Sequence, residues 1–264
     1  MDLKNARILL TGASGGLGQE LARQLNDAGA ALLLAGRDQG RLAALSTSLG
    51  TGVASVCADL GRPAGVVALA GAAREFGINV LINNAGVGAF GLFENQDWPT
   101  IEGVLATNLE APVRLTHALL PWLKAQPQAA IVNIGSTFGS LPFPGFVAYS
   151  AAKAGLRGFS QALRRELADS LVSVVHIAPR AIDTPLNSDP VKALNRALKN
   201  HSDSAEDVAR QIVRALRRGD GESHFGFPER LFAWINGFAP ALIDRGLAGK
   251  LAIIKQHSSS SSSS

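Results

Sequence analysis

Tyr149 is the only tyrosine in the 264-residue chain, and it lies four residues before Lys153 and thirteen after Ser136. If the segment from Tyr149 onward is helical, residues four apart share one face, so the phenol and the ammonium group can approach the same small volume. A nearby cation lowers the pKa of a phenol from about 10 toward working pH, where it can donate or accept a proton. Ser136 can then hydrogen-bond the same substrate oxygen. The spacing indicates acid–base chemistry at a polar substrate atom.

A glycine-rich turn follows the first apolar stretch of the chain. The segment ARILL runs into TGASGGLG at residues 11–18 and then into QELARQLNDAGA, a pattern typical of strand, tight turn and helix. Gly12, Gly16 and Gly18 allow the backbone to approach a pyrophosphate, whose charge is favoured by the free N–H groups of the following helix. The spacing is one residue wider than the usual G-x-G-x-x-G, so a plain connection is the alternative interpretation.

Further motifs accompany these two in a fixed order. They are Asp59-Leu60 after a third apolar stretch, Asn83-Asn84-Ala85-Gly86 after a fourth, Asn108 within ATNLEAP, and Tyr149-Ser150-Ala151-Ala152-Lys153. With these motifs the chain resembles the classical short-chain dehydrogenases/reductases over nearly its whole length. The resemblance implies an enzyme that transfers hydride between a nicotinamide cofactor and a carbonyl or alcohol carbon.

The resemblance also implies a role for each of four catalytic residues. Tyr149 would protonate a carbonyl or deprotonate an alcohol. Lys153 would bind the nicotinamide ribose and lower the pKa of the tyrosine. Ser136 would orient the substrate oxygen, and Asn108 would support a water molecule in a proton relay.

The cofactor site implied by the resemblance draws on the ends of several strands. The predicted cofactor-binding residues are Gly12, Ser14, Gly15, Gly16, Leu17, Gly18, Arg37, Asp59, Leu60, Asn84, Ala85, Gly86, Tyr149, Lys153, Pro179, Ile182 and Thr184. No metal site is predicted.

Cofactor preference can be read from AGRDQGRL at the end of the second apolar stretch. A site for NAD(H) places an acidic side chain there, on the adenosine ribose. Gly36 occupies that place, and Arg37 follows with a guanidinium suited to a 2'-phosphate. Asp38 is interpreted as a helix N-cap. Gly15 lacks the basic side chain that many NADP-using relatives carry, and Arg41 can partly compensate. We therefore predict NADP(H), with NAD(H) as the alternative.

The pair Pro179-Arg180 departs from the resemblance, because Pro-Gly commonly follows the sixth strand of this family. Arg180 would place a cation at the mouth of the cofactor or substrate site. It could bind an acidic substrate group or the cofactor pyrophosphate. The alternative is an arginine turned toward solvent.

Six apolar stretches alternate with helical patterns along the chain, near residues 6–11, 30–35, 53–58, 78–83, 129–135 and 172–178. This alternation predicts an α/β fold, with a Rossmann-like, doubly wound parallel sheet that is covered on both faces. A single domain is expected over residues 1–255. The serine-rich segment 256–264 is expected to be a disordered tail or a tag remnant.

Composition narrows the class of protein. The formal net charge is only +4 and the basic residues are dispersed, so no nucleic-acid partner is predicted. Cys57 is the single cysteine, which excludes an internal disulfide and fits a reducing compartment, and a buried thiol is its simplest interpretation. The amino terminus has no signal-peptide pattern, so a cytoplasmic location is predicted.

Apolar segments are the expected determinants of substrate specificity. They are Val87 to Phe93, Phe138 to Phe146, and Leu186 to Asn200, which could fold over the cofactor. Phe138, Phe143 and Phe146 can form an apolar wall or simply pack in the core. The apolar carboxyl end, including Trp234 and Phe238, could cover the active site, meet another subunit or rest on a membrane surface. A medium-sized or lipid-like carbonyl compound or alcohol is the predicted substrate.

Family resemblance further implies a homodimer or homotetramer, packed through helices near residues 98–124 and 149–170. Phe159 and Leu163 form an apolar stripe there that faces either the sheet or a partner. The functional alternative to an oxidoreductase is a catalytically silent regulator that binds a dinucleotide on the same fold. The complete set of Asn108, Ser136, Tyr149 and Lys153 favours the enzyme.

Overall fold

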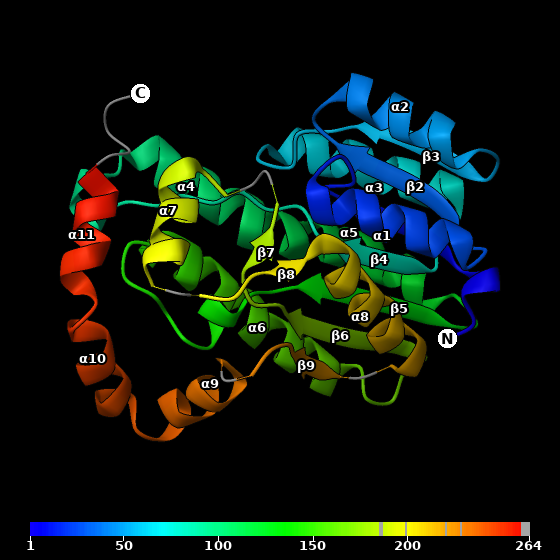
Figure 1. Cartoon of the computed structure of the whole chain (residues 1–264). Coiled ribbons are helices and arrows are strands. Elements are labelled where there is room, and N and C mark those ends of the chain that lie inside the picture. Colours follow the sequence, from blue (N-terminus) through cyan, green and yellow to red (C-terminus); the bar gives the residue numbers. More distant parts are fainter. Residues whose placement is uncertain (185–186, 199, 220, 228, 260–264) are drawn as a thin grey trace.

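A parallel sheet of seven strands forms the centre of the molecule in the computed structural model, which describes residues 1–184, 187–198, 200–219, 221–227 and 229–259 (Figure 1). The strand order is β3-β2-β1-β4-β5-β6-β9. The bounds are β1 (Arg7–Thr11), β2 (Ala31–Gly36), β3 (Val53–Cys57), β4 (Val80–Asn83), β5 (Ala129–Ile134), β6 (Val172–Ala178) and β9 (Glu222–His224). The predicted doubly wound α/β fold is confirmed.

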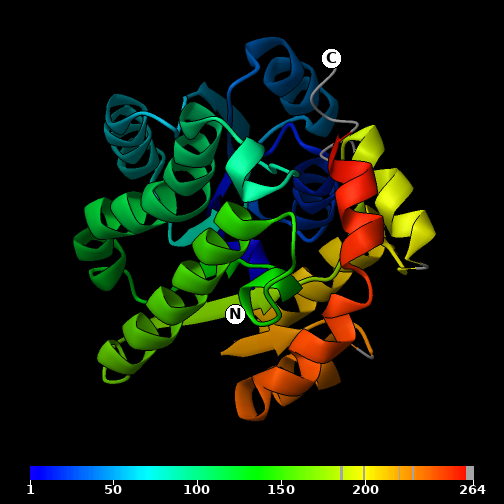
Figure 2. The ribbon, with the colours of Figure 1, turned by 90° about the vertical axis from the view of Figure 1, so that its left-hand side faces the viewer.

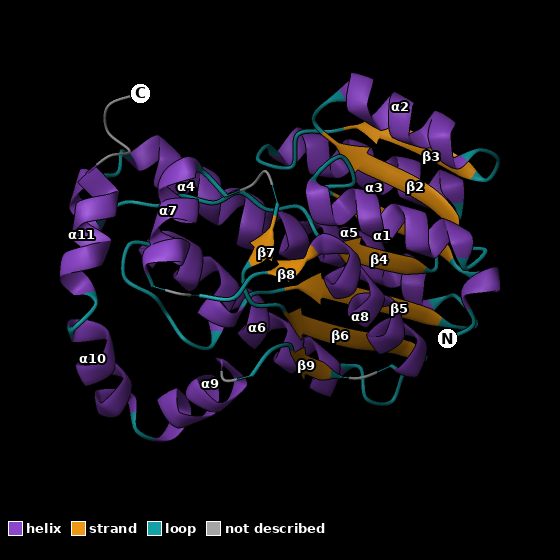
Figure 3. Cartoon of the chain, viewed as in Figure 1, coloured by secondary structure: helices purple, strands orange, loops and turns teal. Residues whose placement is uncertain are grey.

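Helices cover both faces of the sheet because the central strands are apolar on both sides (Figure 3). One face packs against α1 (Gly16–Asp27), α2 (Gln39–Leu49) and α8 (Ala205–Arg218). The other packs against α3 (Pro63–Phe76), α5 (Ala111–Lys124) and α6 (Val147–Glu166). Leu163 of α6 is buried in this second core and Phe159 is partly buried against it, so the stripe faces the core.

The carboxyl ends of the strands meet at one edge of the sheet, where the order reverses between β1 and β4. Ligands of open parallel sheets bind in the crevice at such a reversal. The short elements around this edge are 3-10 helices at Phe93–Asn95 and Thr137–Gly139, helix α4 (Trp98–Leu105), a π-helix at Ala106–Glu110, and a small second sheet of β7 (Ile182–Asp183) and β8 (Asp203–Ser204). The 3-10 helix at Leu3–Asn5 precedes β1 and lies at the opposite edge.

Cys57 corrects one expectation. It ends the edge strand β3, and it is exposed, with its thiol donating to the carbonyl oxygen of Arg37 at 3.3 Å. A buried thiol was expected from residue type alone, but an edge strand leaves one side of its last residues uncovered.

Three consecutive helices form a C-terminal arm, defined here as residues 229–259. They are α9 (Glu229–Phe238), α10 (Pro240–Ala248) and α11 (Leu251–Ser259). Figure 2 shows α11 beside α7 (Asp189–Ala197), with α9 and α10 leading back toward β9. Helix α11 reaches Ser259, four residues into the segment expected to be a tail, and residues 260–264 lie outside the described part of the chain. No helix in the described residues is long and apolar enough to cross a membrane.

Candidate active site

Tyr149 and Lys153 lie one turn apart in the first two turns of α6. The Nζ atom of Lys153 is 5.7 Å from the centre of the Tyr149 ring. It also donates a hydrogen bond of 2.8 Å to the carbonyl oxygen of Ile134, the last residue of β5. Lys153 is buried, with 4% of its surface exposed. Helical spacing therefore brings the two groups onto one side of α6, and the end of β5 fixes the ammonium group.

Burial controls the proton affinity of both groups. It lowers the pKa of Lys153 to about 8, because the charged ammonium is taken out of water. It raises the pKa of the Tyr149 phenol, and a hydrogen bond with the Ser136 side chain offsets only part of the rise. The direction is opposite to the lowering suggested by the Tyr-Lys spacing. Within the polypeptide the phenol is therefore held in its protonated form.

Ser136 stands at the end of β5 and caps the short 3-10 helix that follows. Its hydroxyl oxygen accepts a hydrogen bond of 3.2 Å from the backbone N–H of Phe138. The next residue, Thr137, donates from its backbone and its hydroxyl to the carbonyl oxygen of Pro179, at 2.9 and 3.1 Å. The loops after β5 and β6 are thus joined beside Tyr149.

Asn108 occupies the π-helix between α4 and α5, the kind of local widening that often marks functional sites. Its side chain makes two hydrogen bonds with the backbone of Val87: it accepts from the N–H at 3.0 Å and donates to the carbonyl oxygen at 2.7 Å. A Cβ added to Gly86 would lie 2.8 Å from Asn108 Oδ1 and 3.8 Å from Lys153 Nζ. Only glycine allows these elements to meet so closely.

The glycine turn is joined tightly to the loop after β4. Gly12 has a φ of +66°, and a Cβ there would lie 2.7 Å from the Cα of Ala85. The hydroxyl of Thr11 accepts from the backbone N–H groups of Asn84 and Ala85, each at 3.0 Å. A Cβ on Gly18 would lie 2.1 Å from the carbonyl oxygen of Gly12. Thr11 was missed by the sequence analysis, although a hydroxyl closing an apolar strand is a visible signal.

The turn fits a pyrophosphate for a second reason. Helix α1 begins at Gly16, and its N-cap, Gly15, supplies no side-chain hydrogen bond to the first turn. The N–H groups of that turn are therefore left for an anion.

The end of β2 matches the expected adenosine site. Asp38 caps α2 by accepting a hydrogen bond of 2.9 Å from the backbone N–H of Arg41, which confirms its interpretation as an N-cap. The Arg41 guanidinium also lies 3.5 Å from the Asp38 carboxylate. Arg37 is exposed beside them. The charge of Arg41 is thus partly neutralised by Asp38.

One cavity of about 1870 Å³ brings the predicted site together. Every predicted cofactor-binding residue lines it, and so does Ser136. Asn108 is fully buried behind this lining. No cluster of metal-ligating side chains occurs among the residues that the structure describes.

An aromatic wall lies at the Tyr149 end of the cavity. The ring centres of Phe138 and Phe146 are 5.1 Å apart, and each is 6.4 Å from that of Tyr149. Phe143 stacks on Phe138 at 5.3 Å, and Phe90 contacts Phe146 at 5.0 Å. Sequence analysis left open whether these rings form a wall or pack in the core. All four phenylalanines line the cavity. The segment 186–200 was also expected at this site, and residues 186 and 199 of it lie outside the described part of the chain.

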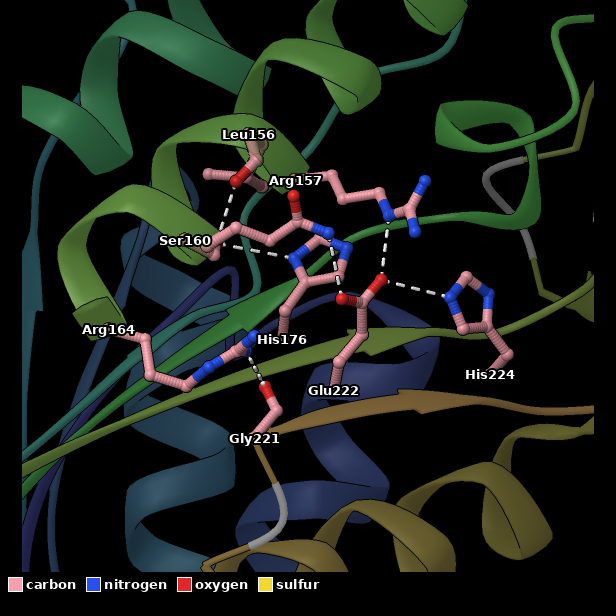
Figure 4. A network of polar contacts seen from close by, with 9 residues as sticks. Leu156, Arg157, Ser160, Arg164, His176, Gly221, Glu222 and His224 are labelled. Carbon is pink, nitrogen blue, oxygen red and sulfur yellow. Dashed lines mark hydrogen bonds and ion pairs between the residues drawn. The ribbon is translucent and has the colours of Figure 1, made fainter. Parts of the chain in front are cut away.

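A polar network fixes α6 to the sheet (Figure 4). Glu222 of β9 accepts hydrogen bonds from Arg157 at 2.6 Å and Gln161 at 2.9 Å, and its oxygen lies 3.0 Å from the Nε2 atom of His224. Ser160 lies 3.3 Å from the Nδ1 atom of the buried His176. The network holds the helix that carries Tyr149 and Lys153 against β6 and β9.

Known proteins resemble this chain in sequence and structure. The family described as short chain dehydrogenase matches residues 6–195. The uncharacterized oxidoreductase DltE of Bacillus subtilis is 32% identical over 231 residues, covering 84% of this chain and 88% of DltE. A short chain dehydrogenase/reductase of Burkholderia phymatum in complex with NAD has a TM-score of 0.83 and 25% identity, covering 92% of this chain and 96% of that one. A short-chain dehydrogenase of Sphingobium yanoikuyae in complex with NADPH has a TM-score of 0.78 and 30% identity, covering 90% and 95%.

Proposed function

The chain belongs to the short-chain dehydrogenase/reductase family, and from this premise we propose that it is an NADP-dependent oxidoreductase acting on an apolar or acyl-type substrate. Membership makes it an NAD(P)-dependent dehydrogenase or reductase. The preference for NADP(H) and the nature of the substrate are the proposed part. The observation that carries the proposal is the single cavity in which Arg37 lies at one end and Tyr149 lies among phenylalanine rings at the other.

The residues of the cavity have separate roles in carbonyl reduction. A bound nicotinamide supplies the hydride, or accepts it in the reverse direction. The Tyr149 phenol gives its proton to the substrate oxygen, which suits a group that burial keeps protonated. The Ser136 hydroxyl orients the same oxygen, and Lys153 holds its positive charge beside the phenol. Asn108 fixes the loop at Val87, which forms the wall of the site.

Support for NADP(H) comes from the end of β2. Gly36 supplies no carboxylate, and a Cβ there would lie 3.0 Å from the Ser14 hydroxyl. A 2'-phosphate beside Arg37 would gain a charge-assisted hydrogen bond. The two solved relatives carry NAD in one case and NADPH in the other, so the preference rests on this chain's own residues.

The test is an initial-rate assay with NADPH and NADH against aldehydes, ketones and β-ketoacyl thioesters. We expect turnover of apolar carbonyl compounds with NADPH. Arg37→Ala should weaken NADPH binding about 10- to 150-fold and NADH binding little, since a charged hydrogen bond contributes about 1.5 to 3 kcal/mol and only NADPH has the phosphate.

Two outcomes would contradict the proposal. Equal loss for both cofactors in Arg37→Ala, or a wild-type preference for NADH, argues against NADP(H). Tight NADPH binding without turnover of any carbonyl favours the silent regulator instead.

A homo-oligomer and a cytoplasmic location also stay proposals. The outer face of α6 supports the first: Val147 is 46% exposed, and Ala151, Ala154 and Gly158 are exposed beside it. Such a row of small side chains allows another helix to approach closely.

A further inference from the structure

Arg180 lies in the loop after β6, where it lines the cavity and makes ionic contacts within the chain. Its Nε and Nη2 atoms donate to the two carboxylate oxygens of Asp203, at 2.8 and 2.6 Å. Its Nη1 atom lies 3.7 Å from Glu229 Oε2. The side chains of Arg180, Asp203 and Glu229 are only 20%, 18% and 24% exposed. We call these three residues the Arg180 clamp.

The clamp joins three segments that are distant in sequence. Arg180 follows β6, Asp203 belongs to β8, and Glu229 is the first residue of α9 and of the C-terminal arm. Glu229 Oε2 is buried and has no hydrogen-bond partner among the described residues, so the positive charge of Arg180 offsets its burial.

Gly226 shows how closely the chain passes over Arg180 before the arm begins. It has a φ of +96°, and a Cβ there would lie 2.7 Å from Arg180 Cδ and 3.0 Å from Glu229 Oε2. A larger residue at position 226 would be strained by the positive φ and would clash with these two side chains, so the backbone would have to move away. The start of the arm is therefore fitted to the arginine.

The arm is attached at two further points along its length. Asn236 donates a hydrogen bond of 3.1 Å to the carbonyl oxygen of Ser140. Ile254 of α11 is fully buried near Gly145, where an added Cβ would lie 3.4 Å from the isoleucine. Phe232, Leu242 and Leu247 of the arm line the same cavity as Tyr149.

From this geometry we propose that Arg180 is a positioning residue that sets the substrate end of the cavity by holding the C-terminal arm in place as its outer wall. The proposal rests on the proposed function. The favoured substrates are neutral, elongated apolar carbonyl compounds or alcohols that extend from Tyr149 to the arm. Substrates with a carboxylate near the clamp are disfavoured, because one guanidinium and two carboxylates leave the clamp with a net charge of −1.

The experiment compares neutral methyl ketones of increasing chain length with keto acids of matching length. In the wild type, kcat/KM should rise about threefold to fourfold per added methylene until the cavity is filled, since each buried methylene contributes a near-constant transfer free energy. In Arg180→Ala the gain in kcat/KM per added methylene should fall below twofold, and the change should appear in KM more than in kcat. Arg180→Lys should restore part of it, because the charge opposite Glu229 is kept.

Two more variants separate the clamp from general damage. Glu229→Gln should raise kcat/KM for keto acids relative to ketones at least about tenfold, since one like charge is removed. Arg230→Ala changes an exposed arginine next to the clamp on the same helix and should leave the chain-length dependence as it is in the wild type.

Hydrogen exchange measured with NADPH bound tests the clamp independently of turnover. Amides of α9 should exchange at least about tenfold faster in Arg180→Ala than in Arg230→Ala. Unchanged exchange together with an unchanged chain-length dependence would overturn the proposal. A wild type that reduces no carbonyl compound would instead remove the proposed function, and the exchange result would still decide whether Arg180 holds the arm.

Discussion

The chemistry of single residues depends here on burial more than on spacing. Tyr149 and Lys153 have the separation that a sequence can reveal, yet burial moves the pKa of the phenol up and that of the ammonium down, to about 8. Both shifts favour the neutral form of each group. A protonated phenol can donate its proton to a carbonyl oxygen during reduction. In the oxidation direction the phenol must first lose its proton, and the positive charge of the Lys153 ammonium favours that loss.

Tyr149→Phe tests this assignment, because it deletes one hydroxyl and keeps the ring among the phenylalanines. We expect kcat to fall about 10²- to 10⁴-fold, the usual contribution of general acid catalysis. The dissociation constant of NADPH and the melting temperature should change little. Initial rates, cofactor fluorescence titration and thermal unfolding measure the three quantities. Retention of more than a tenth of the wild-type kcat at its optimal pH would remove Tyr149 as the proton donor.

The difference between local spacing and contacts between distant segments explains which site residues could be predicted from the sequence. Ser136, Tyr149 and Lys153 were predicted because their types and order match a family, and all three line the cavity. The role of Arg180 was not found, because its partners Asp203 and Glu229 lie 23 and 49 residues further along the chain and belong to no motif. Contacts between distant segments leave no local pattern.

At the scale of elements, the long apolar strands were predictable and the short ones were not. The six predicted strands correspond to β1–β6, because buried parallel strands are continuous apolar runs. Strand β9 contains Glu222 and His224, and it exists because β6 offers an open edge and α6 supplies partners for the carboxylate. Helix α6 and strand β9 therefore depend on each other, and this dependence is sensitive to pH.

Glu222→Gln tests the link between β9 and α6. Although burial opposes it, hydrogen bonds from Gln161, Arg157 and His224 lower the pKa of Glu222 to about 2, from 4.5. A depressed carboxylate pKa stabilises the fold above pH 4.5, and the stabilisation is lost as pH falls toward 2. The variant should lose about 1.5 to 3 kcal/mol of unfolding free energy at neutral pH, the usual contribution of charged hydrogen bonds.

Urea unfolding between pH 2 and 8 measures this effect. Glu166→Gln, at the exposed end of α6, is the matched control and should change the unfolding free energy by less than about 0.5 kcal/mol. Burial also lowers the pKa of His176 from 6.5 to about 4, so stability should fall in both proteins as pH drops from 6.5 to 4. If Glu222→Gln keeps the wild-type stability at neutral pH, the network does not hold the strand.

At the scale of the whole molecule, two exposed surfaces of the described chain bear on its assembly. One is the outer side of the C-terminal arm, where Trp234 and Phe238 are 63% and 78% exposed. The other is the exposed row of Val147, Ala151 and Ala154 on α6, which lines a groove together with Leu247 and Leu251 of the arm. The second surface lies on the helix that carries Tyr149 and Lys153, so a partner bound there would also restrain these two residues.

We expect the 27.5-kDa chain to assemble into a dimer or tetramer through this face of α6. Ala154→Arg should dissociate it, because a long cation replaces an exposed methyl group where two helices would meet closely. Phe159 is unsuitable for this test, since it is partly buried against the core. Ala68→Arg places the same side chain on the exposed side of α3 and should leave assembly intact. Light scattering at micromolar concentration gives the mass of each protein, with turnover measured in parallel. A monomeric wild type with full activity would contradict the assembly, whereas a monomeric Ala154→Arg variant with reduced turnover would show that the partner braces the catalytic helix.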